Sequence, residues 1–413
     1  MNIKINIFVM IHEVKQKLFI IALLFFPFLT TAQESEKKDG IKFGGALRYN
    51  TIKTNYESSS KKTEVAFDTW RLNMDGSLSG IDFSFEYRFY PSGEYHFIHH
   101  GWFGYKFSDV VYTKLGVSQV PFGVQGFASH SYFFQAPYYV GLEDDYDMGI
   151  KFDITPTEDI DIALAYYRQA EPKGSGGSGF ASRYSYDIVP GMGSYVDANG
   201  NFVSSQATIS ELNQFNARAS WRFTPGWEAG LSGQVGGIYN EVLDKSEAST
   251  AFAAHLVGSF AGFNLKAEYV NYNYKAKDDD GNKLDVVQMG AYGYDYAGGE
   301  TANGQKYTGG VASKANIYAV SLAYGIPVNW GPISNIQPYV DYSYVDKAND
   351  NFYDTQHLIP GVMVTAGPIY AYFDYAMGKN QAWFTDDFGK GFGSGVAEAD
   401  WNGRFNINLG YYF

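Results

Sequence analysis

The last thirteen residues, Trp401 to Phe413, constrain the fold most strongly because their apolar side chains recur at every second position. The apolar residues of this stretch are Phe405, Ile407, Leu409, Tyr411 and Phe413. Successive side chains of a β-strand point to opposite faces, so this spacing predicts a strand with one apolar and one mostly polar face. The same period recurs along the chain and is clearest in residues 81–90, where aromatic and polar side chains alternate.

Composition indicates where such strands could be stable. Aromatic residues make up 18% of the 413 residues, yet the mean hydropathy is -0.25, because the rings are dispersed among polar residues. A transmembrane β-barrel has this composition, since lipid-facing and lumen-facing residues alternate along each strand. The chain has no Cys, which excludes disulfides and thiolate metal sites. Its formal net charge of -13 argues against nucleic-acid binding.

The terminal strand also resembles a known signal. Carboxy-terminal strands that end in Phe are typical of bacterial outer-membrane β-barrels, and the strand that ends in Phe413 is similar to them. The resemblance implies a protein of a Gram-negative outer membrane, surrounded by outer-membrane lipid. It also implies that the barrel assembly machinery recognises the strand that ends in Phe413.

The amino-terminal region has the pattern of a secretory signal. Two lysines precede an apolar run at 18–29, and the small residues Thr30–Ala32 follow it. This run is too short for a membrane-spanning helix and has the length of a signal-peptide apolar region. We therefore expect a signal peptide at 1–32, with Met10 as an alternative start, and a polar leader at 33–40.

The connections between the expected strands alternate in length from residue 41 to residue 413. Eight longer loops and seven short turns separate sixteen strands, which predicts an all-β fold, a transmembrane antiparallel β-barrel. Such barrels have short periplasmic turns, long extracellular loops and an even number of strands. A further strand pair, 285–296 with 307–313, would raise the number to eighteen. In hydrocarbon every backbone polar group must be paired, so the sheet has to close, and sixteen strands leave an aqueous lumen.

Residues opposite the aromatic face of each strand are expected to point into this lumen. The basic residues that we expect to line the pore are Arg48, Arg71, Arg88, Lys114, Arg218, Arg222, Lys266 and Arg404. Acidic residues share the same face. Two interpretations remain open: solvated wall charges that neutralise one another, or a basic path that attracts anions through a constriction.

The long segment 119–146 interrupts the alternation after the fifth strand. In many sixteen-stranded porins the loop at this place folds inward and narrows the pore, and the aromatic residues of this segment suit packing against a barrel wall. The residues that we expect in this constriction loop are Gln119, Pro121, Phe122, Gly123, Tyr132, Glu143, Asp144 and Asp145.

A motif at the start of this segment suggests a family. The octapeptide Gly116–Gly123 resembles the G-x-x-K-x-P-F-G stretch of the phosphate-selective porin O/P family. The resemblance implies a sixteen-stranded channel, often trimeric, in which lysines of the inward loop and a ladder of lumen arginines favour phosphate or other anions. The chain departs from the motif at Gln119, where the family has Lys, and 119–146 contains no Lys or Arg.

Other motifs carry weaker signals. We expect His96, His99 and His100 in an exposed polar loop rather than in a zinc site, because no acidic third ligand is nearby. Asp278–Asp280 lacks the ligand-spaced Glu of a calcium loop, and Gly174–Gly179 lacks the context of a phosphate-binding loop. No catalytic residue, metal site or cofactor is predicted.

The function that these observations favour is passive diffusion of small hydrophilic solutes or ions, including anions such as phosphate, through an outer-membrane porin. The family resemblance implies a homotrimer as one possible assembly, and the protein is not expected to be an enzyme. The alternatives are an outer-membrane barrel enzyme of the lipase or protease type, and a barrel that docks a partner without transport.

Overall fold

The computed structural model of the protein describes residues 39–413 except for 58–62, 297–298, 301–305, 308 and 387–388. The predicted signal peptide and all but the end of the polar leader lie outside the described residues. The strands of the main sheet are β1 (Gly40–Thr54), β2 (Thr63–Leu78), β3 (Ile81–Tyr90), β4 (Tyr95–Lys106), β5 (Val111–Gln119), β6 (Tyr146–Thr157), β7 (Ile160–Ala170), β11 (Ile209–Thr224), β12 (Trp227–Asn240), β13 (Lys245–Phe260), β14 (Phe263–Asn273), β21 (Lys314–Tyr324), β22 (Ile326–Trp330), β23 (Ile333–Lys347), β24 (Thr355–Ala366), β25 (Ile369–Lys379) and β26 (Asn402–Tyr412).

These strands form a closed antiparallel barrel. Each strand pairs with the next one along the chain, and β26 returns to pair with β1. β21 and β22 are separated by Gly325 but both pair with β23, so together they make one of the sixteen barrel strands. The backbone of Phe413 completes the closure, because its N–H donates to the Gly45 carbonyl at 3.1 Å and its carbonyl accepts from the Gly45 N–H at 2.8 Å. The predicted fold class is confirmed.

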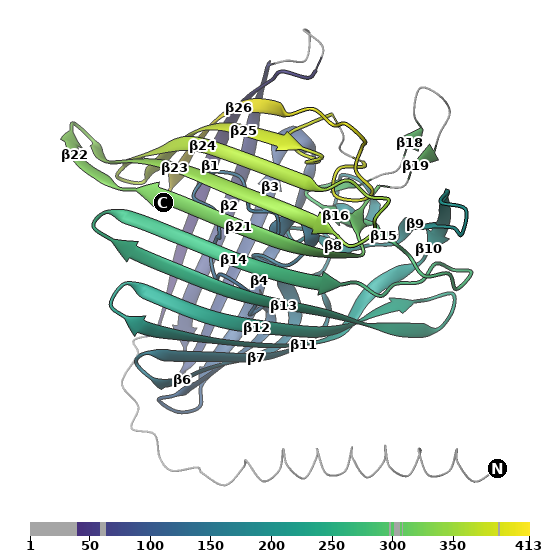
Figure 1. Cartoon of the computed structure of the whole chain (residues 1–413). Helices are drawn as coiled ribbons and strands as arrows, with labels where there is room; N and C mark the ends of the chain where they lie inside the picture. Colours follow the sequence, from purple (N-terminus) through teal and green to yellow (C-terminus); the bar gives the residue numbers. More distant parts are fainter. Residues whose placement is uncertain (1–38, 58–62, 297–298, 301–305, 308, 387–388) are drawn as a thin grey trace, which may run out of the picture. The chain divides into compact units, whose positions relative to one another are not determined.

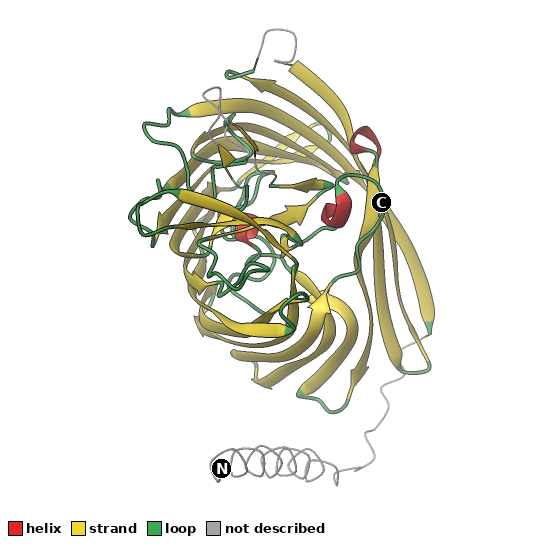
Figure 2. Cartoon of the chain, turned by 90° about the vertical axis from the view of Figure 1, so that its right-hand side faces the viewer, coloured by secondary structure: helices red, strands yellow, loops and turns green. Residues whose placement is uncertain are grey.

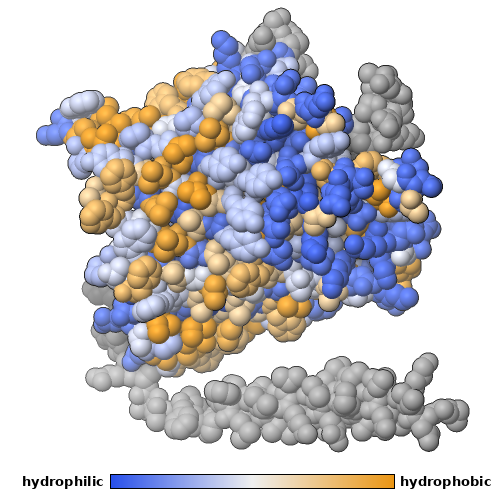
Figure 3. Space-filling model, viewed as in Figure 1, coloured by the Kyte–Doolittle hydropathy of each residue, from blue (hydrophilic) through white to orange (hydrophobic). Residues whose placement is uncertain are grey.

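The two faces of the barrel strands differ as the sequence pattern predicts. On β26, Phe405, Leu409 and Tyr411 are exposed, whereas Asn406 and Asn408 are buried on the inner face. Apolar side chains gather over the barrel strands, while the end that carries β9 and β10 is largely hydrophilic (Figure 3). An outer apolar surface on a closed sheet is the arrangement that faces lipid.

The connections divide between the two ends of the barrel (Figure 1). One end has short turns, as between β2 and β3 or between β13 and β14. The other end has the longer connections, and four of them are much longer than the rest, at 120–145, 171–208, 274–313 and 380–401. This alternation agrees with the sequence prediction.

The long connections pair with one another in small sheets. Their strands are β8 (Asp187–Ile188), β9 (Gly191–Val196), β10 (Phe202–Ala207), β15 (Val286–Val287), β16 (Met289–Ala291), β17 (Tyr294–Asp295), β18 (Gly299–Glu300), β19 (Lys306–Tyr307) and β20 (Val311–Ala312). β15 and β20 do pair, as the alternative of eighteen strands requires, but they belong to a separate sheet with β9 and β10. The alternative of eighteen barrel strands is therefore wrong.

A buried core joins these connections to the inside of the barrel. Tyr138, Tyr184, Tyr272 and Tyr296 come from different parts of the chain, and each is almost fully buried in one cluster. Viewed from the side that carries the long connections, loop segments lie inside the ring of strands (Figure 2). The short helical turns are η1 (Pro91–Gly93), which joins β3 to β4, η2 (Tyr138–Val140), which is buried, and η3 (Gly179–Ala181). Within the described residues, no helix is both long enough and apolar enough to cross a membrane.

The three histidines do not lie in an exposed loop, so that expectation is wrong. All three belong to β4, where the pairing with β3 shifts between Glu86 and Tyr87 and leaves His99 as an extra, buried residue. His96 bonds through Nδ1 to the Tyr87 hydroxyl at 2.6 Å, and the Nδ1 atoms of His99 and His100 lie 2.8 Å apart. His99 is buried against the rings of Tyr146 and Tyr184, whereas His96 and His100 are half-buried.

Candidate functional site

Residues 120–145, here called the inner segment, run across the inside of the barrel and contact inward-facing side chains of several strands. Arg218 of β11 donates from Nε to the Gly123 carbonyl at 2.8 Å, and the Gly123 N–H donates to Ser232 Oγ of β12 at 3.0 Å. Gly123 has a φ of +56°, and a Cβ there would lie 1.8 Å from Glu268 Oε1. Glycine is therefore required where the inner segment approaches β14.

The middle of the inner segment is held by two charged residues of the wall. Lys266 Nζ of β14 donates to the carbonyls of Phe127 and Ser129, at 2.6 and 2.9 Å. Asp341 of β23 is fully buried and accepts the backbone N–H groups of His130 and Ser131, the closest at 2.8 Å. Bonds of backbone groups to charged partners are stronger than neutral ones, so these contacts fix the position of the segment.

Further along, a buried amide anchors the inner segment to three strands. Gln135 Nε2 donates to Ser321 Oγ of β21 at 2.7 Å, and Gln135 Oε1 lies 2.9 Å from His357 Nε2 of β24. The same oxygen accepts from the Ser343 hydroxyl of β23. The segment is thus bonded to the wall along most of its length.

A cavity of about 370 Å³ lies between the inner segment and the neighbouring strands β26, β1, β2 and β3. Four arginines, one from each of these strands, line it: Arg404, Arg48, Arg71 and Arg88. The other lining residues are mostly aromatic and come from these four strands, from β4 and β25, from the inner segment, from the loops at 171–208 and 274–313, and from residue 383. The sequence predicted that these arginines point inward, and the structure brings the four together on adjacent strands.

An irregularity in β2 positions the partners of Arg48. The pairing of β1 with β2 shifts after Arg48, which leaves Asp68 as an extra residue beside Thr69. Arg48 Nε lies 2.9 Å from Asp68 Oδ2, and Arg48 Nη2 donates to Thr69 Oγ1 at 2.7 Å. Consecutive residues of a regular strand face opposite ways, so the bulge is what allows both to reach Arg48. Asp68 also accepts the hydroxyl of Tyr132, from the inner segment, at 3.0 Å.

The remaining arginines differ in how far their charge is neutralised. Arg88 pairs with Glu86 and lies over the Tyr184 ring at 4.4 Å. Arg71 and Arg404 have no carboxylate within salt-bridge distance among the residues that the structure describes; their guanidinium carbons lie 5.8 Å from the Tyr412 ring and 5.2 Å from the Phe133 ring. The cavity wall is therefore positively charged in a protein whose net charge is -13.

The other four predicted lining residues lie outside this cavity. Arg218 and Lys266 bind the inner segment, as described above. Lys114 pairs with Asp153 at 3.3 Å, and Arg222 pairs with Asp161 near the short turn between β6 and β7. Lys114, Arg218 and Arg222 pair with carboxylates of the wall, so for these three residues the alternative of wall charges that neutralise one another describes the geometry better.

The predicted constriction residues also divide by position. Tyr132 lines the cavity, whereas Pro121, Phe122 and the acidic residues are absent from its lining. Gln119 Nε2 donates to Asp144 Oδ1 at 2.7 Å, and Asp144 also accepts the Tyr184 hydroxyl. Burial raises the pKa of Asp144 to about 7, and the bond from Tyr184 opposes that rise.

Glu143, near the end of the inner segment, is buried. It accepts the Ala128 N–H at 2.8 Å, and burial, with a smaller contribution from Glu268, holds its pKa well above the usual range. The acidic end of the segment is thus part of its internal packing and does not face the cavity.

No protein-family model and no curated protein matches the chain. Solved outer-membrane proteins share its fold. The outer membrane channel DcaP of Acinetobacter baumannii is 12% identical over 93% of this chain and 100% of that chain, with a TM-score of 0.53. An anion-selective porin from Comamonas acidovorans is 13% identical over 91% and 100%, with a TM-score of 0.54. OmpT, an outer membrane protein of Vibrio cholerae solved in a trimer form, is 13% identical over 91% and 100%, with a TM-score of 0.53.

At these identities the similarity concerns the fold. It confirms the predicted closed barrel of the outer-membrane porin type and supports the predicted location in the bacterial outer membrane. The neighbours named above are channels, porins and outer-membrane proteins. The phosphate-selective O/P family is not among them, so the resemblance of Gly116–Gly123 stays a prediction.

Proposed function

We propose that the protein is an outer-membrane porin whose lumen narrows at the arginine-walled cavity and favours small anions during passive diffusion. The inner segment acts as the constriction, because it lies inside the barrel and forms one side of the cavity. One structural neighbour is described as an anion-selective porin, which agrees with this proposal. The proposal assigns no catalytic residue.

The observation that carries the proposal is the charge of the cavity wall. Four arginines line it, and among the described residues of the lining Asp68 is the one acidic residue. A narrow passage with low-dielectric walls concentrates the field of such charges and raises the local concentration of the opposite ion. Arg71 and Arg404, which have no carboxylate partner among the described residues, contribute most to this field.

The size and the aromatic lining define the class of solute. The cavity volume of about 370 Å³ is at the lower end of the volumes of pockets that bind small molecules. Roughly twelve water molecules occupy the same volume in liquid water. The space suits inorganic anions with part of their hydration, or small organic anions whose body lies against the rings. A phosphate preference would rest on the wall arginines, since 119–146 has no Lys or Arg.

Reversal potentials in planar bilayers under a KCl gradient test the proposal. Wild-type channels are expected to prefer chloride, and the variant Arg71→Gln/Arg404→Gln is expected to lose most of that preference. Arg222→Gln is the matched control, because it removes one cation that is paired with Asp161 away from the cavity. Equal selectivity of the wild type and the double variant would refute the role of the cavity, and absence of any channel would refute the porin function.

We also propose two partners. A homotrimer is suggested by the trimeric form of the Vibrio cholerae neighbour, and cross-linking of the folded protein in detergent would test it. Recognition by the barrel assembly machinery is suggested by the closing strand β26, and loss of outer-membrane insertion on removal of Phe413 would test it.

A further inference from the structure

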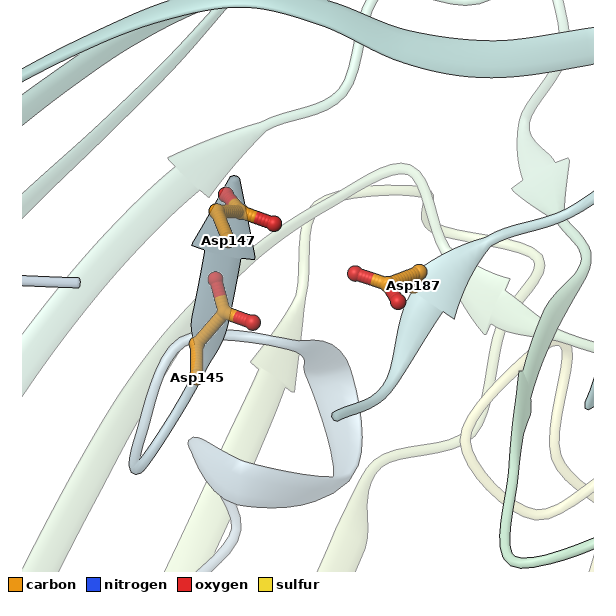
Figure 4. Close-up of side chains that lie close together, drawn as sticks. All are labelled: Asp145, Asp147 and Asp187. Atoms are coloured by element: carbon orange, nitrogen blue, oxygen red, sulfur yellow. The ribbon is translucent and has the colours of Figure 1, made fainter. Parts of the chain in front are cut away.

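Three buried carboxylates meet where the inner segment joins β6. Asp145 ends the inner segment, Asp147 lies in β6, and Asp187 lies in β8 of the loop at 171–208. One oxygen of each lies within 4.8 Å of the others, and the three groups point toward one another (Figure 4). Their exposed fractions are 6%, 1% and 1%.

These carboxylates have unused oxygens. Asp147 Oδ2 accepts from Gln214 at 3.0 Å and Asp187 Oδ2 accepts from Arg183 at 2.6 Å, but Oδ1 of Asp145, Asp147 and Asp187 is buried without a hydrogen-bond partner in the described structure. A buried anion without a partner is strongly destabilising, so such atoms normally face a proton, a water or an ion.

A fourth carboxylate provides an independent sign of a missing partner. Glu171 is 2% exposed, its Oε1 accepts the Ser185 N–H at 2.9 Å, and its Oε2 has no hydrogen-bond partner among the described residues. Among the described residues one guanidinium, that of Arg183, lies within salt-bridge distance of these groups, at 2.6 Å from Asp187 and 3.9 Å from Glu171.

The geometry fits one hard cation. Calcium binds carboxylate oxygens at about 2.3–2.6 Å, so two of its ligands lie at most about 5.2 Å apart. The limit of 4.8 Å among the three aspartates falls within that range. Within the described structure these four carboxylates, with Glu211 as a fifth beside Asp187, face one arginine and leave an excess of negative charge that a divalent ion would offset.

We propose that Asp145, Asp147 and Asp187, assisted by Glu171, form a Ca²⁺ site inside the barrel mouth. The ion connects the end of the inner segment, the start of β6 and the loop at 171–208, and so fixes the inner segment against its neighbours. The site does not depend on the proposed transport, because the cavity arginines take no part in it.

The test uses the full protein folded in detergent, from which EDTA has removed bound metal. Calorimetry then measures the binding of Ca²⁺. Tb³⁺ binding is followed by luminescence sensitised through Tyr146, which lies between Asp145 and Asp147 in the sequence. One Ca²⁺ per chain is expected, with an affinity at least tenfold lower for Asp145→Asn/Asp147→Asn. Asp280→Asn is the control, because Asp280 is exposed in the other acidic loop.

The proposal would be overturned if the wild type bound no Ca²⁺ at a concentration of about 10 mM, which exceeds the dissociation constants of the weakest extracellular Ca²⁺ sites. Protons shared between the carboxylates would then explain the unpartnered oxygens. Equal binding by the wild type and the double variant would overturn it too, and would place the ion elsewhere. If the double variant does not fold, Asp187→Asn takes its place. The wild-type melting temperature must also rise with Ca²⁺ concentration, as it does for any ligand of the folded state, and a constant value would contradict the site.

Discussion

Asp341 offers the sharpest test of what holds the inner segment in place. Its side chain is fully buried and accepts two backbone N–H groups, those of His130 and Ser131, at 3.0 and 2.8 Å. Hydrogen bonds to a charged partner contribute about 1.5–3 kcal/mol each, so Asp341→Ala removes about 3–6 kcal/mol from the docking of this part of the segment. That loss equals a factor of roughly 10² to 10⁴ in the equilibrium between docked and undocked forms.

The consequence should appear in the channel, because Ser131, Tyr132 and Phe133 line the cavity next to these bonds. Single-channel recordings of Asp341→Ala are expected to show larger conductance and more frequent current fluctuations than the wild type. The control is Asp346→Ala, a residue of the same strand that bonds to Asn316 and not to the inner segment. The altered migration of unheated protein in gels must first show that both variants fold. A folded Asp341→Ala with wild-type conductance and current noise would refute the reasoning.

Three further predictions concern stability and assembly. Leu231→Arg places a charge on the lipid face, where the Leu231 side chain is 56% exposed, and should lower the free energy of unfolding by about 2–4 kcal/mol if the residue lies near the bilayer midplane. A urea titration in lipid vesicles measures the loss, and an unchanged midpoint would contradict the assignment of this face to lipid. Arg218→Leu removes the cation 2.8 Å from Glu228 and the donor to the Gly123 carbonyl, while Arg222 stays 3.9 Å from Glu228, and should cost about 1.5–3 kcal/mol. Part of the loss should be restored in Arg218→Leu/Glu228→Leu, and equal midpoints for the two variants would argue against the pair. Phe413→Ala removes a ring that lies against Gly45 and should lower the amount of protein in outer-membrane fractions; a wild-type amount would mean that the terminal ring is dispensable.

The barrel itself could be predicted because its signal is local. In β26 the side chains from Phe405 to Phe413 alternate, and a strand converts that order directly into two faces. The eight inward basic residues followed from the same parity. The alternation of side chains along a strand tells which face a residue lies on. It tells neither the height of the residue in the barrel nor its neighbours across the lumen. Arg48 and Arg404 could not be distinguished from Lys114 and Arg222 for that reason.

Contacts between the long connections could not be predicted. β15 and β8 have two residues each, too few to show a period, and they pair with strands far away in the sequence. Asp145 and Asp147 were visible as an acidic stretch, but Asp187 joins them through the folding of another loop. The histidines of β4 were misplaced because the bulge at His99 breaks the alternation that identifies a strand.

Bulges of this kind change what a barrel wall can present. A regular strand offers the lumen every second side chain and gives the alternate ones to lipid, so a new interior charge normally replaces an existing interior residue. Asp68 and His99 are exceptions, because each is an extra residue at a bulge. The lumen gains a side chain there, while the residues before and after the bulge in β2 and β4 keep their lipid-facing positions. The insertion of one residue is therefore a route by which pore chemistry can diversify without altering the membrane surface, and deletion of Asp68 should move part of β2 by one position rather than merely remove a carboxylate.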